Sequence, residues 1–296
     1  MEQKNVLEME TFLSKFPFED KKKYEWKIIA KKERNKVYWG KNYKNKNDYL
    51  YVKQIFIKYN DTDKNEHKNL YKEIFLLFSL KKYKYFPKNV KTLFSSDEEF
   101  LFIIFRNFNI NLNLLIKSKL YLENAELIKW IIYQIAFGLY TIHSNNIIHH
   151  DIKPSNILID SKSRISICDF GSALIKGEDT YEYSLSYASP EFFIKSLKKI
   201  NDKNDQQYDM WSLGILILEL ILEDSGFHNK NNKDKKVQLK KIYLKFGIDE
   251  KYIDDVLLKE LDENKKIEFK IEEKIVDKIM EKTKDKSAID LLKKLL

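Results

Sequence analysis

The spacing of apolar residues changes about one third of the way along the chain. Before the change, short segments are rich in aromatic and β-branched residues, a composition that predicts β-strands. A helix is expected where apolar residues recur every three or four positions. On this basis we expect strands at 24–29, 36–39, 49–57, 90–94 and 100–105, and helices at 3–15 and 70–80.

From about residue 112 onward, the apolar spacing is mainly that of helices. Two long apolar segments, 125–144 and 209–222, are expected to be helices with apolar faces turned inward. Two short strands are expected between them, at 157–159 and 165–167. A β-rich first third followed by a mostly helical remainder predicts an α+β fold.

The composition narrows the class of protein. The chain has 296 residues, of which 43% are hydrophobic, and a single cysteine, Cys168. We therefore expect a globular protein without a disulfide framework, located in the cytoplasm or the nucleus. No apolar run is long enough to span a membrane, and the N-terminus lacks the apolar core of a secretory signal. We expect no membrane partner.

The formal net charge of +9 would by itself suit a nucleic-acid or anionic-membrane surface. The lysines, however, are spread along the whole chain and mixed with acidic residues, and only three arginines occur. A protein that reads nucleic acid is expected to use more arginine for bidentate contacts. We therefore expect no nucleic-acid partner.

Four motifs follow one another in the second half of the chain. They are His149–His150–Asp151–Ile152–Lys153–Pro154–Ser155–Asn156, Asp169–Phe170–Gly171, Ser189–Pro190–Glu191 and Asp209–Met210–Trp211–Ser212–Leu213–Gly214. In this order and spacing the chain resembles the eukaryotic protein kinase family over roughly residues 22–296. The resemblance implies a bilobal α+β fold, with an N-terminal extension at 1–21, a small β-rich lobe at 22–107 and a mainly helical lobe at 108–296.

The resemblance also implies a role for each charged residue of these motifs. Asp151 would be the base that accepts the proton of the substrate hydroxyl, with Lys153 near the transferred phosphate. Asn156 and Asp169 would hold Mg²⁺, and Asp209 would cap the backbone of the loop that carries Asp151. A lysine at position 153 is typical of serine/threonine kinases.

Residues that bind ATP are implied by the same resemblance. Lys53 matches the lysine that grips the phosphates, and Glu73 matches the glutamate that orients it. Lys58 is a rival for Lys53, but it would require an overlong strand region. Further contacts with the nucleotide are expected from Ile29, Val37, Phe105 and Asn107.

The segment that would cover the phosphates departs from the family pattern. Ala30, Lys32 and Asn35 stand where the family has three glycines, whose backbone amides approach the phosphates closely. Tyr51 replaces a small alanine beside the adenine, so its ring must either stack on the base or block it. His150 replaces an arginine that binds an activation-loop phosphate in the family.

The chain ends at Leu296. Residues 290–296 resemble the helix that the family calls H, and the segment after it normally supplies an arginine for the glutamate that matches Glu191. No arginine follows Arg164 here. We therefore expect a helical lobe truncated after helix H and loosened around Glu191.

The function implied by the resemblance is that of an ATP- and Mg²⁺-dependent serine/threonine protein kinase. Its expected partners are protein substrates with serine or threonine and a regulatory protein, and its activation loop offers residues for phosphorylation: Ser172, Thr180, Tyr181 and Tyr183. The alternative is a pseudokinase scaffold with weak or no turnover, suggested by the missing glycines and Tyr51. Cys168 either lines the nucleotide pocket or is a buried, inert thiol.

Overall fold

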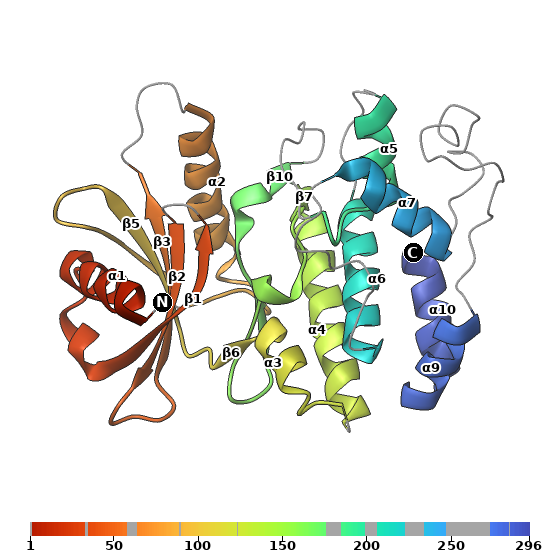
Figure 1. Cartoon of the computed structure of the whole chain (residues 1–296), viewed down its shortest axis with the longest axis horizontal. Coiled ribbons are helices and arrows are strands. Elements are labelled where there is room, and N and C mark those ends of the chain that lie inside the picture. The colour runs from red at the N-terminus through yellow and green to blue at the C-terminus, as the bar shows by residue number, and fades with distance from the viewer. Residues whose placement is uncertain are drawn as a thin grey trace. The chain divides into compact units, whose positions relative to one another are not determined.

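Five strands form the main sheet of the first of two units into which the chain divides (Figure 1). The first unit comprises residues 1–112 and 157–171, and the second comprises residues 113–156 and 172–296. The structure is a computed structural model that describes residues 2–32, 35–57, 64–88, 90–122, 124–175, 185–198, 206–222, 234–246, 273–283 and 285–296.

The strand order in this sheet is β1-β2-β3-β5-β4, and every neighbouring pair is antiparallel. Side chains alternate between the two faces of a strand, so Leu50 and Val52 of β3 lie on one face and Tyr51 and Lys53 lie on the other. The strands are β1 Tyr24–Lys32, β2 Asn35–Asn42, β3 Tyr49–Phe56, β4 Val90–Phe94 and β5 Phe100–Arg106.

Helix α1, Glu2–Lys15, packs on one face of this sheet (Figure 1). The ring of Phe12 stacks on that of Tyr38 with the centroids 3.7 Å apart, and the rings of Phe16 and Phe102 lie 5.0 Å apart. Phe12 of the helix and Phe16, the residue after its end, are both buried. Aromatic residues ahead of the expected lobe boundary therefore belong to the core of this unit, and the boundary itself stays a prediction.

Gly40 of β2 lies opposite Trp26 of β1. A Cβ atom at position 40 would come within 2.7 Å of the Trp26 ring, closer than non-bonded carbon atoms approach one another. Packing against tryptophan therefore explains the one glycine that precedes Gly138.

Helix α2 and a second sheet complete the first unit. Helix α2, Lys64–Leu80, buries Leu76, Leu77 and Leu80, whereas Phe78 is exposed. The second sheet has the strand order β6-β8-β9. Its strands are β6 Ile110–Asn111, β8 Ile157–Ile159 and β9 Ile165–Ile167. The chain leaves β9 directly into Cys168 and Asp169.

The second unit is built around helix α6, Gln207–Leu222, which is buried along nearly its whole length. Helix α4 turns Ile131, Ile135 and Leu139 into the core, as expected. Two short strands, β7 and β10, pair antiparallel. The elements are α3 Leu112–Ser118, α4 Ala125–His143, β7 Ile147–Ile148, β10 Leu174–Ile175, α5 Pro190–Lys198, α7 Lys235–Phe246, α9 Glu273–Thr283 and α10 Lys286–Leu295. The expected α+β composition is confirmed.

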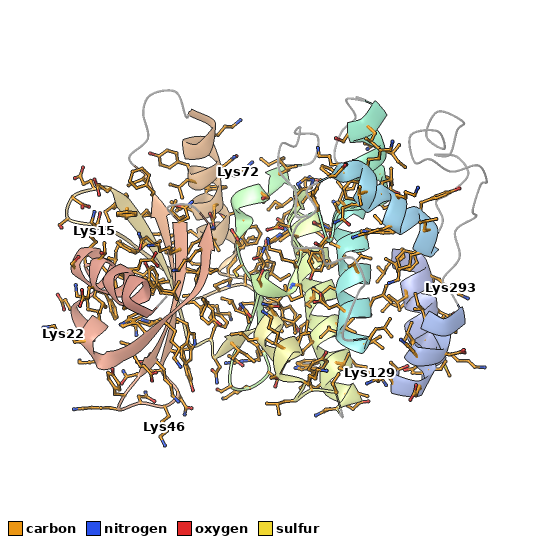
Figure 2. The ribbon with its side chains drawn as sticks, in the orientation of Figure 1. Lys15, Lys22, Lys46, Lys72, Lys129 and Lys293 are labelled. Carbon is orange, nitrogen blue, oxygen red and sulfur yellow. The ribbon has the colours of Figure 1, made fainter. Side chains whose placement is uncertain are left out.

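Lysine side chains extend from many separate elements of both units (Figure 2). Those labelled in the figure are Lys15, Lys22, Lys46, Lys72, Lys129 and Lys293. The positive charge is thus distributed over the chain. Among the helices that the structure describes, none is long and apolar enough to cross a membrane.

Candidate active site

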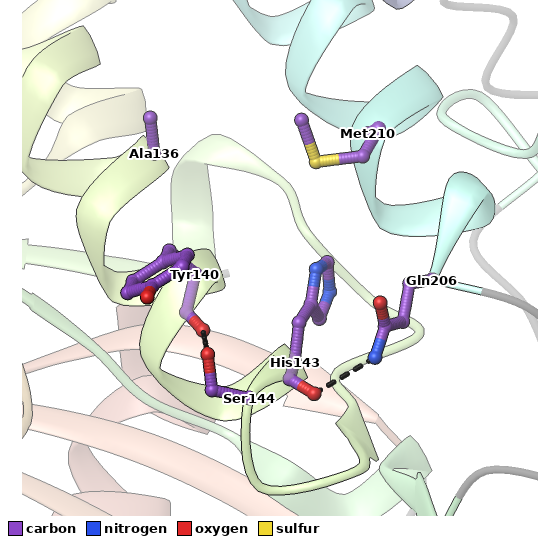
Figure 3. A pocket seen from close by; sticks show the side chains of 6 residues that line it. All are labelled: Ala136, Tyr140, His143, Ser144, Gln206 and Met210. Carbon is purple, nitrogen blue, oxygen red and sulfur yellow. Dashed lines mark hydrogen bonds between the residues drawn. The ribbon is translucent and has the colours of Figure 1, made fainter.

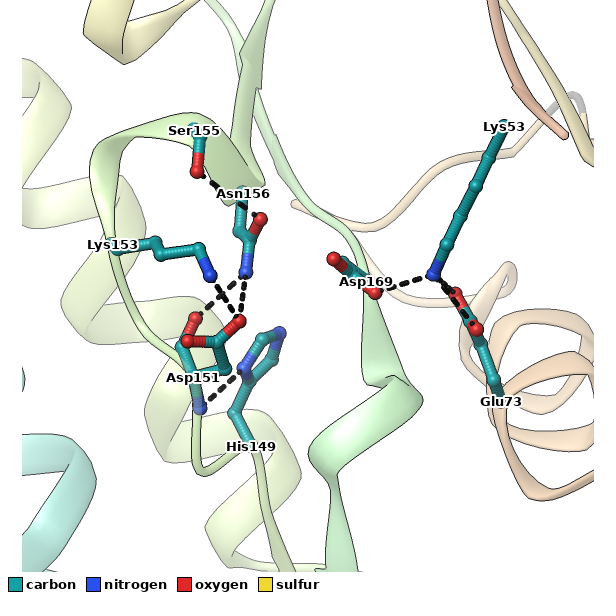
Figure 4. A network of polar contacts seen from close by, with 8 residues as sticks. All are labelled: Lys53, Glu73, His149, Asp151, Lys153, Ser155, Asn156 and Asp169. Atoms are coloured by element: carbon teal, nitrogen blue, oxygen red, sulfur yellow. Dashed lines mark hydrogen bonds and ion pairs between the residues drawn. The ribbon is translucent and has the colours of Figure 1, made fainter. Parts of the chain in front are cut away.

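A lysine held between two carboxylates forms the first polar cluster, in the first unit (Figure 4). Lys53 Nζ lies 2.7 and 2.9 Å from the two carboxylate oxygens of Glu73 and 2.6 Å from Asp169 Oδ1. Lys53 comes from β3, Glu73 from α2 and Asp169 from the turn after β9. Three segments that are distant in the sequence are therefore joined through the ammonium group of Lys53.

Burial and the neighbouring charges together set the pKa values of this cluster. Burial alone would lower the pKa of Lys53, but the adjacent carboxylates of Asp169 and Glu73 outweigh it and raise that pKa above its usual value. Burial raises the pKa of Glu73, whose side chain is only 3% exposed, with the Asp169 charge adding to this effect and the Lys53 charge opposing it. Lys53 therefore keeps its proton at neutral pH and compensates two acidic groups.

Gly171 lies next to this cluster. A Cβ atom at position 171 would lie 3.5 Å from carboxylate oxygens of both Asp169 and Glu73, and 3.9 Å from Lys53 Nζ. The missing side chain thus keeps an apolar group away from the three charges. Asp169 itself adopts a left-handed backbone conformation, with φ at 67°, which aspartate tolerates better than most residues.

A second polar cluster, in the second unit, surrounds Asp151 (Figure 4). Lys153 Nζ lies 2.5 Å from Asp151 Oδ2, and Asn156 Nδ2 donates to the same oxygen at 3.0 Å and to the Asp151 backbone carbonyl at 2.8 Å. The other oxygen, Asp151 Oδ1, is buried and accepts no hydrogen bond from the part of the chain that the structure describes. This arrangement fixes Oδ2, and leaves Oδ1 without a hydrogen bond from the described residues.

Asp209 anchors the loop that carries Asp151. Its carboxylate accepts the backbone N–H groups of His149 and His150 at 2.8 Å each, and lies 2.8 Å from His143 Nε2. Burial alone would raise the pKa of Asp209, but the contacts with His143 and His149 outweigh it and lower that pKa. The expectation that Asp209 caps this loop is confirmed.

The remaining residues that are expected to contact the nucleotide belong to the first unit. Val37 of β2 is opposite Lys53, and Phe105 of β5 is opposite Tyr51. Ile29 sits at a break in the β1–β2 register. The backbone N–H of Asn107, which follows β5, donates to the Tyr49 carbonyl at 2.9 Å.

The described residues of the segment aligned with the three glycines of the family lie in β1 and β2. Ala30 pairs with Val37, and Lys32 pairs with Asn35, so β1 and β2 stay in register to the ends of the described strands. Residues 33–34 between them lie outside the described part, as do Lys58 and Thr180, Tyr181 and Tyr183 of the activation loop. The described ladder is therefore built without glycine at these positions.

Two buried residues, His150 and Tyr187, have surroundings that the sequence did not predict. His150 is 1% exposed, with its ring 5.8 Å from that of Tyr208, so its imidazole is packed in the core rather than presented to a phosphate in solvent. Tyr187 donates to Glu219 at 2.6 Å, and Ser212 Oγ donates to the Tyr187 carbonyl. Sequence reasoning missed this pairing of Tyr187 with helix α6, because its only signal is a glutamate within an apolar helix.

A pocket of about 330 Å³ opens between the end of α4 and the start of α6 (Figure 3). Gln206 Nε2 donates to the His143 carbonyl, and Ser144 Oγ donates to the Tyr140 carbonyl, each at 2.8 Å. The lining residues are Ala136, Tyr140, His143, Ser144, Gln206 and Met210. None of them belongs to the two polar clusters.

Comparisons with known proteins all find similarity to protein kinases. The family model described as the protein kinase domain matches residues 13–296. The chain is 34% identical over 170 residues to mitogen-activated protein kinase HOG1 of Candida albicans, which covers 56% of this chain and 42% of the relative. It is 33% identical over 135 residues to mitogen-activated protein kinase 5 of Arabidopsis thaliana, covering 44% and 34%.

One relative carries a different description. A probable inactive serine/threonine-protein kinase of Dictyostelium discoideum is 33% identical over 120 residues, which is 35% of this chain and 14% of that protein. The matched region thus spans less than half the length of each of these three relatives.

Proposed function

The chain belongs to the protein kinase family, and on that premise we propose that it transfers the γ-phosphate of ATP to a serine or threonine hydroxyl of a protein. The observation that carries the proposal is the contact of Lys53 with Glu73 and Asp169 at 2.6–2.9 Å. A cation fixed in this way is oriented to bind the negative oxygens of a phosphate chain.

The described residues fit ATP phosphates and Mg²⁺, which the family uses in general. Lys53 offers a positive charge to phosphate oxygens, and Gly171 beside it adds no side chain there. In the described part of the chain, no three His, Cys, Asp or Glu residues gather to hold a metal by themselves. This suits Mg²⁺, which usually binds one or two carboxylates together with substrate phosphates. We assign Asn156 and Asp169 as its ligands, and bound Mg²⁺ supplies positive charge that neutralises the phosphate oxygens.

Asp151 is assigned as the base. Its carboxylate accepts the proton of the substrate hydroxyl, while Lys153 and Asn156 hold Oδ2 in place. Lys153 also brings a positive charge to the place where the phosphate is transferred. Lys53 grips the phosphates, and Glu73 keeps its ammonium group oriented.

Phosphate transfer to a serine-containing peptide in the presence of Mg²⁺ and ATP tests this function. We expect Asp151→Asn to lose about 100-fold or more of the rate, because a positioned base contributes at least that much. Asp290→Asn, an exposed carboxylate on α10, is the matched control and should keep the rate of the unchanged chain. Equal rates for the two variants would remove Asp151 from the mechanism.

The pseudokinase scaffold is the second candidate. It is suggested by the missing glycines and by Tyr51, and a probable inactive kinase is among the relatives of the chain. Nucleotide-dependent stabilisation separates the two, since ATP at 100 times its dissociation constant raises stability by about 2.7 kcal/mol. A cytoplasmic or nuclear location, a regulatory partner and the lobes at 22–107 and 108–296 remain part of the proposal.

A further inference from the structure

Tyr51 and Lys53 lie on the same face of β3. Residues two positions apart on a strand point to the same side, so a ligand gripped by Lys53 meets Tyr51 next along the strand. Residues directly opposite on antiparallel neighbours also share a face, and Tyr51 has Trp39 on one side and Phe105 on the other. Tyr51 is therefore the centre of an aromatic row beside the phosphate-gripping lysine.

The ring of Tyr51 is buried beside Lys53 and does not line an open surface there. The residue is 3% exposed, and Phe105 beside it is 4% exposed. Burial raises the pKa of the Tyr51 hydroxyl, with Cys168 adding to this effect and the backbone of Asn111 opposing it. The hydroxyl oxygen of Tyr51 is itself buried and has no hydrogen-bond partner among the described residues.

Burial decides between the two roles that the sequence left open. Stacking on a base requires a ring face that a ligand can reach. A side chain with 3% exposure offers no such face. The ring therefore occupies the space into which a base joined to phosphates at Lys53 would extend.

We propose that Tyr51 closes the base-binding part of the nucleotide site, so that the chain grips the phosphates of ATP but gains little from the adenine. The inference rests on the proposed function, because it assumes that Lys53 binds a nucleoside triphosphate. Lys53, Glu73 and Asp169 remain in contact with one another while Tyr51 is in this position. The contacts that position Lys53 for phosphate binding are thus independent of whether the space for the base is open.

Binding of ATP and of inorganic tripolyphosphate to the full chain, both with Mg²⁺, tests the inference without any mutation. A seated adenine is expected to strengthen binding about 100-fold, given the contribution of each ligand atom in drug-sized ligands. With Tyr51 in place we expect ATP to bind no more than about threefold tighter than tripolyphosphate. A preference for ATP of about 100-fold in the unchanged chain would overturn the proposal.

Variants at position 51 test the cause. Tyr51→Ala and Tyr51→Val are expected to bind ATP about tenfold tighter or better, with tripolyphosphate binding unchanged. Tyr51→Phe keeps the ring and should behave as the unchanged chain does. Circular dichroism shows which variants keep the fold. Tyr51→Val is included in case Tyr51→Ala does not fold, because valine favours β-strands. Weaker ATP binding by Tyr51→Ala with no change in Tyr51→Phe would mean that the ring stacks on the base, and would overturn the proposal.

The outcomes separate this inference from the proposed function. Tighter ATP binding by Tyr51→Ala, without phosphate transfer to any peptide, would uphold the inference and reject the kinase activity. Phosphate transfer by the unchanged chain, with ATP affinity unaffected by Tyr51→Ala, would do the reverse. If no variant binds ATP or tripolyphosphate, both fail, because Lys53 then grips no phosphate.

Discussion

The carboxylate of Asp209 accepts the backbone N–H of His150 at 2.8 Å, although the two residues are 59 positions apart. This bond ties the core helix α6 to the loop that carries Asp151. Asp209 is fully buried, so its charge is compensated only by the groups that contact it.

We expect Asp209→Asn to destabilise the chain by about 2–4 kcal/mol, because an amide replaces a charged acceptor of several buried donors. Denaturant unfolding followed by circular dichroism measures the change. The control is Asp290→Asn on α10, an exposed site where about 0.5 kcal/mol or less is expected. Equal destabilisation at the two positions would show that the bonds to His149 and His150 do not hold the loop.

The contribution of Asp209 should also depend on pH. The contacts with His143 and His149 lower its pKa in the folded chain, whereas in the unfolded chain it titrates near its usual value of about 3.9. Between the two pKa values the unfolded state binds more protons, so stability falls as pH falls. We expect the difference in unfolding free energy between wild type and Asp209→Asn to shrink as the pH falls below about 4. A difference that grows on acidification would contradict the lowered pKa.

Lys53 and Glu73 should prove energetically coupled. We expect Lys53→Met to destabilise the chain by about 3–5 kcal/mol, because it leaves Glu73 buried and facing Asp169. Replacing both residues, with Glu73→Gln as the second change, should cost less than the sum of the single changes by about 1–3 kcal/mol. A double-mutant cycle of unfolding free energies measures this coupling, and strict additivity would argue against the pair as a unit.

The aromatic contact of α1 gives a prediction about stability alone. Phe12 stacks on Tyr38 and is 2% exposed, so we expect Phe12→Ala to cost about 3–5 kcal/mol. Glu10→Ala, on the exposed side of the same helix, is the control and should change stability by about 0.5 kcal/mol or less. Thermal unfolding compares the two variants. Similar melting temperatures would mean that α1 contributes little to the core of its unit.

The sequence predicted most of the long elements, because their apolar spacing repeats over several turns or pleats. The helices at 125–144 and 209–222 were expected almost as they occur. The strands at 147–148 and 174–175 were not foreseen, because two residues are too few for a periodic pattern. Their pairing depends on the tertiary fold, which single-sequence spacing does not contain.

The charged clusters were also expected, since the motifs fix which residue types occur at which separation. The orientation of Tyr51 could not be predicted, because stacking and blocking require the same ring and differ only in its burial. The packing of His150 in the core was hidden for a similar reason. A histidine suits a phosphate site or an interior equally well until its neighbours are known.

The position of α1 has a consequence for the order of events during synthesis. This helix leaves the ribosome before the strands on which it packs, because the rings that cover Phe12 and Phe16 belong to Tyr38 and, much later, Phe102. At the usual rate of translation the gap amounts to roughly 4–20 s. During that interval the apolar side of the nascent helix lacks the complete sheet to pack on, so this segment is expected to be a binding site for a ribosome-associated chaperone.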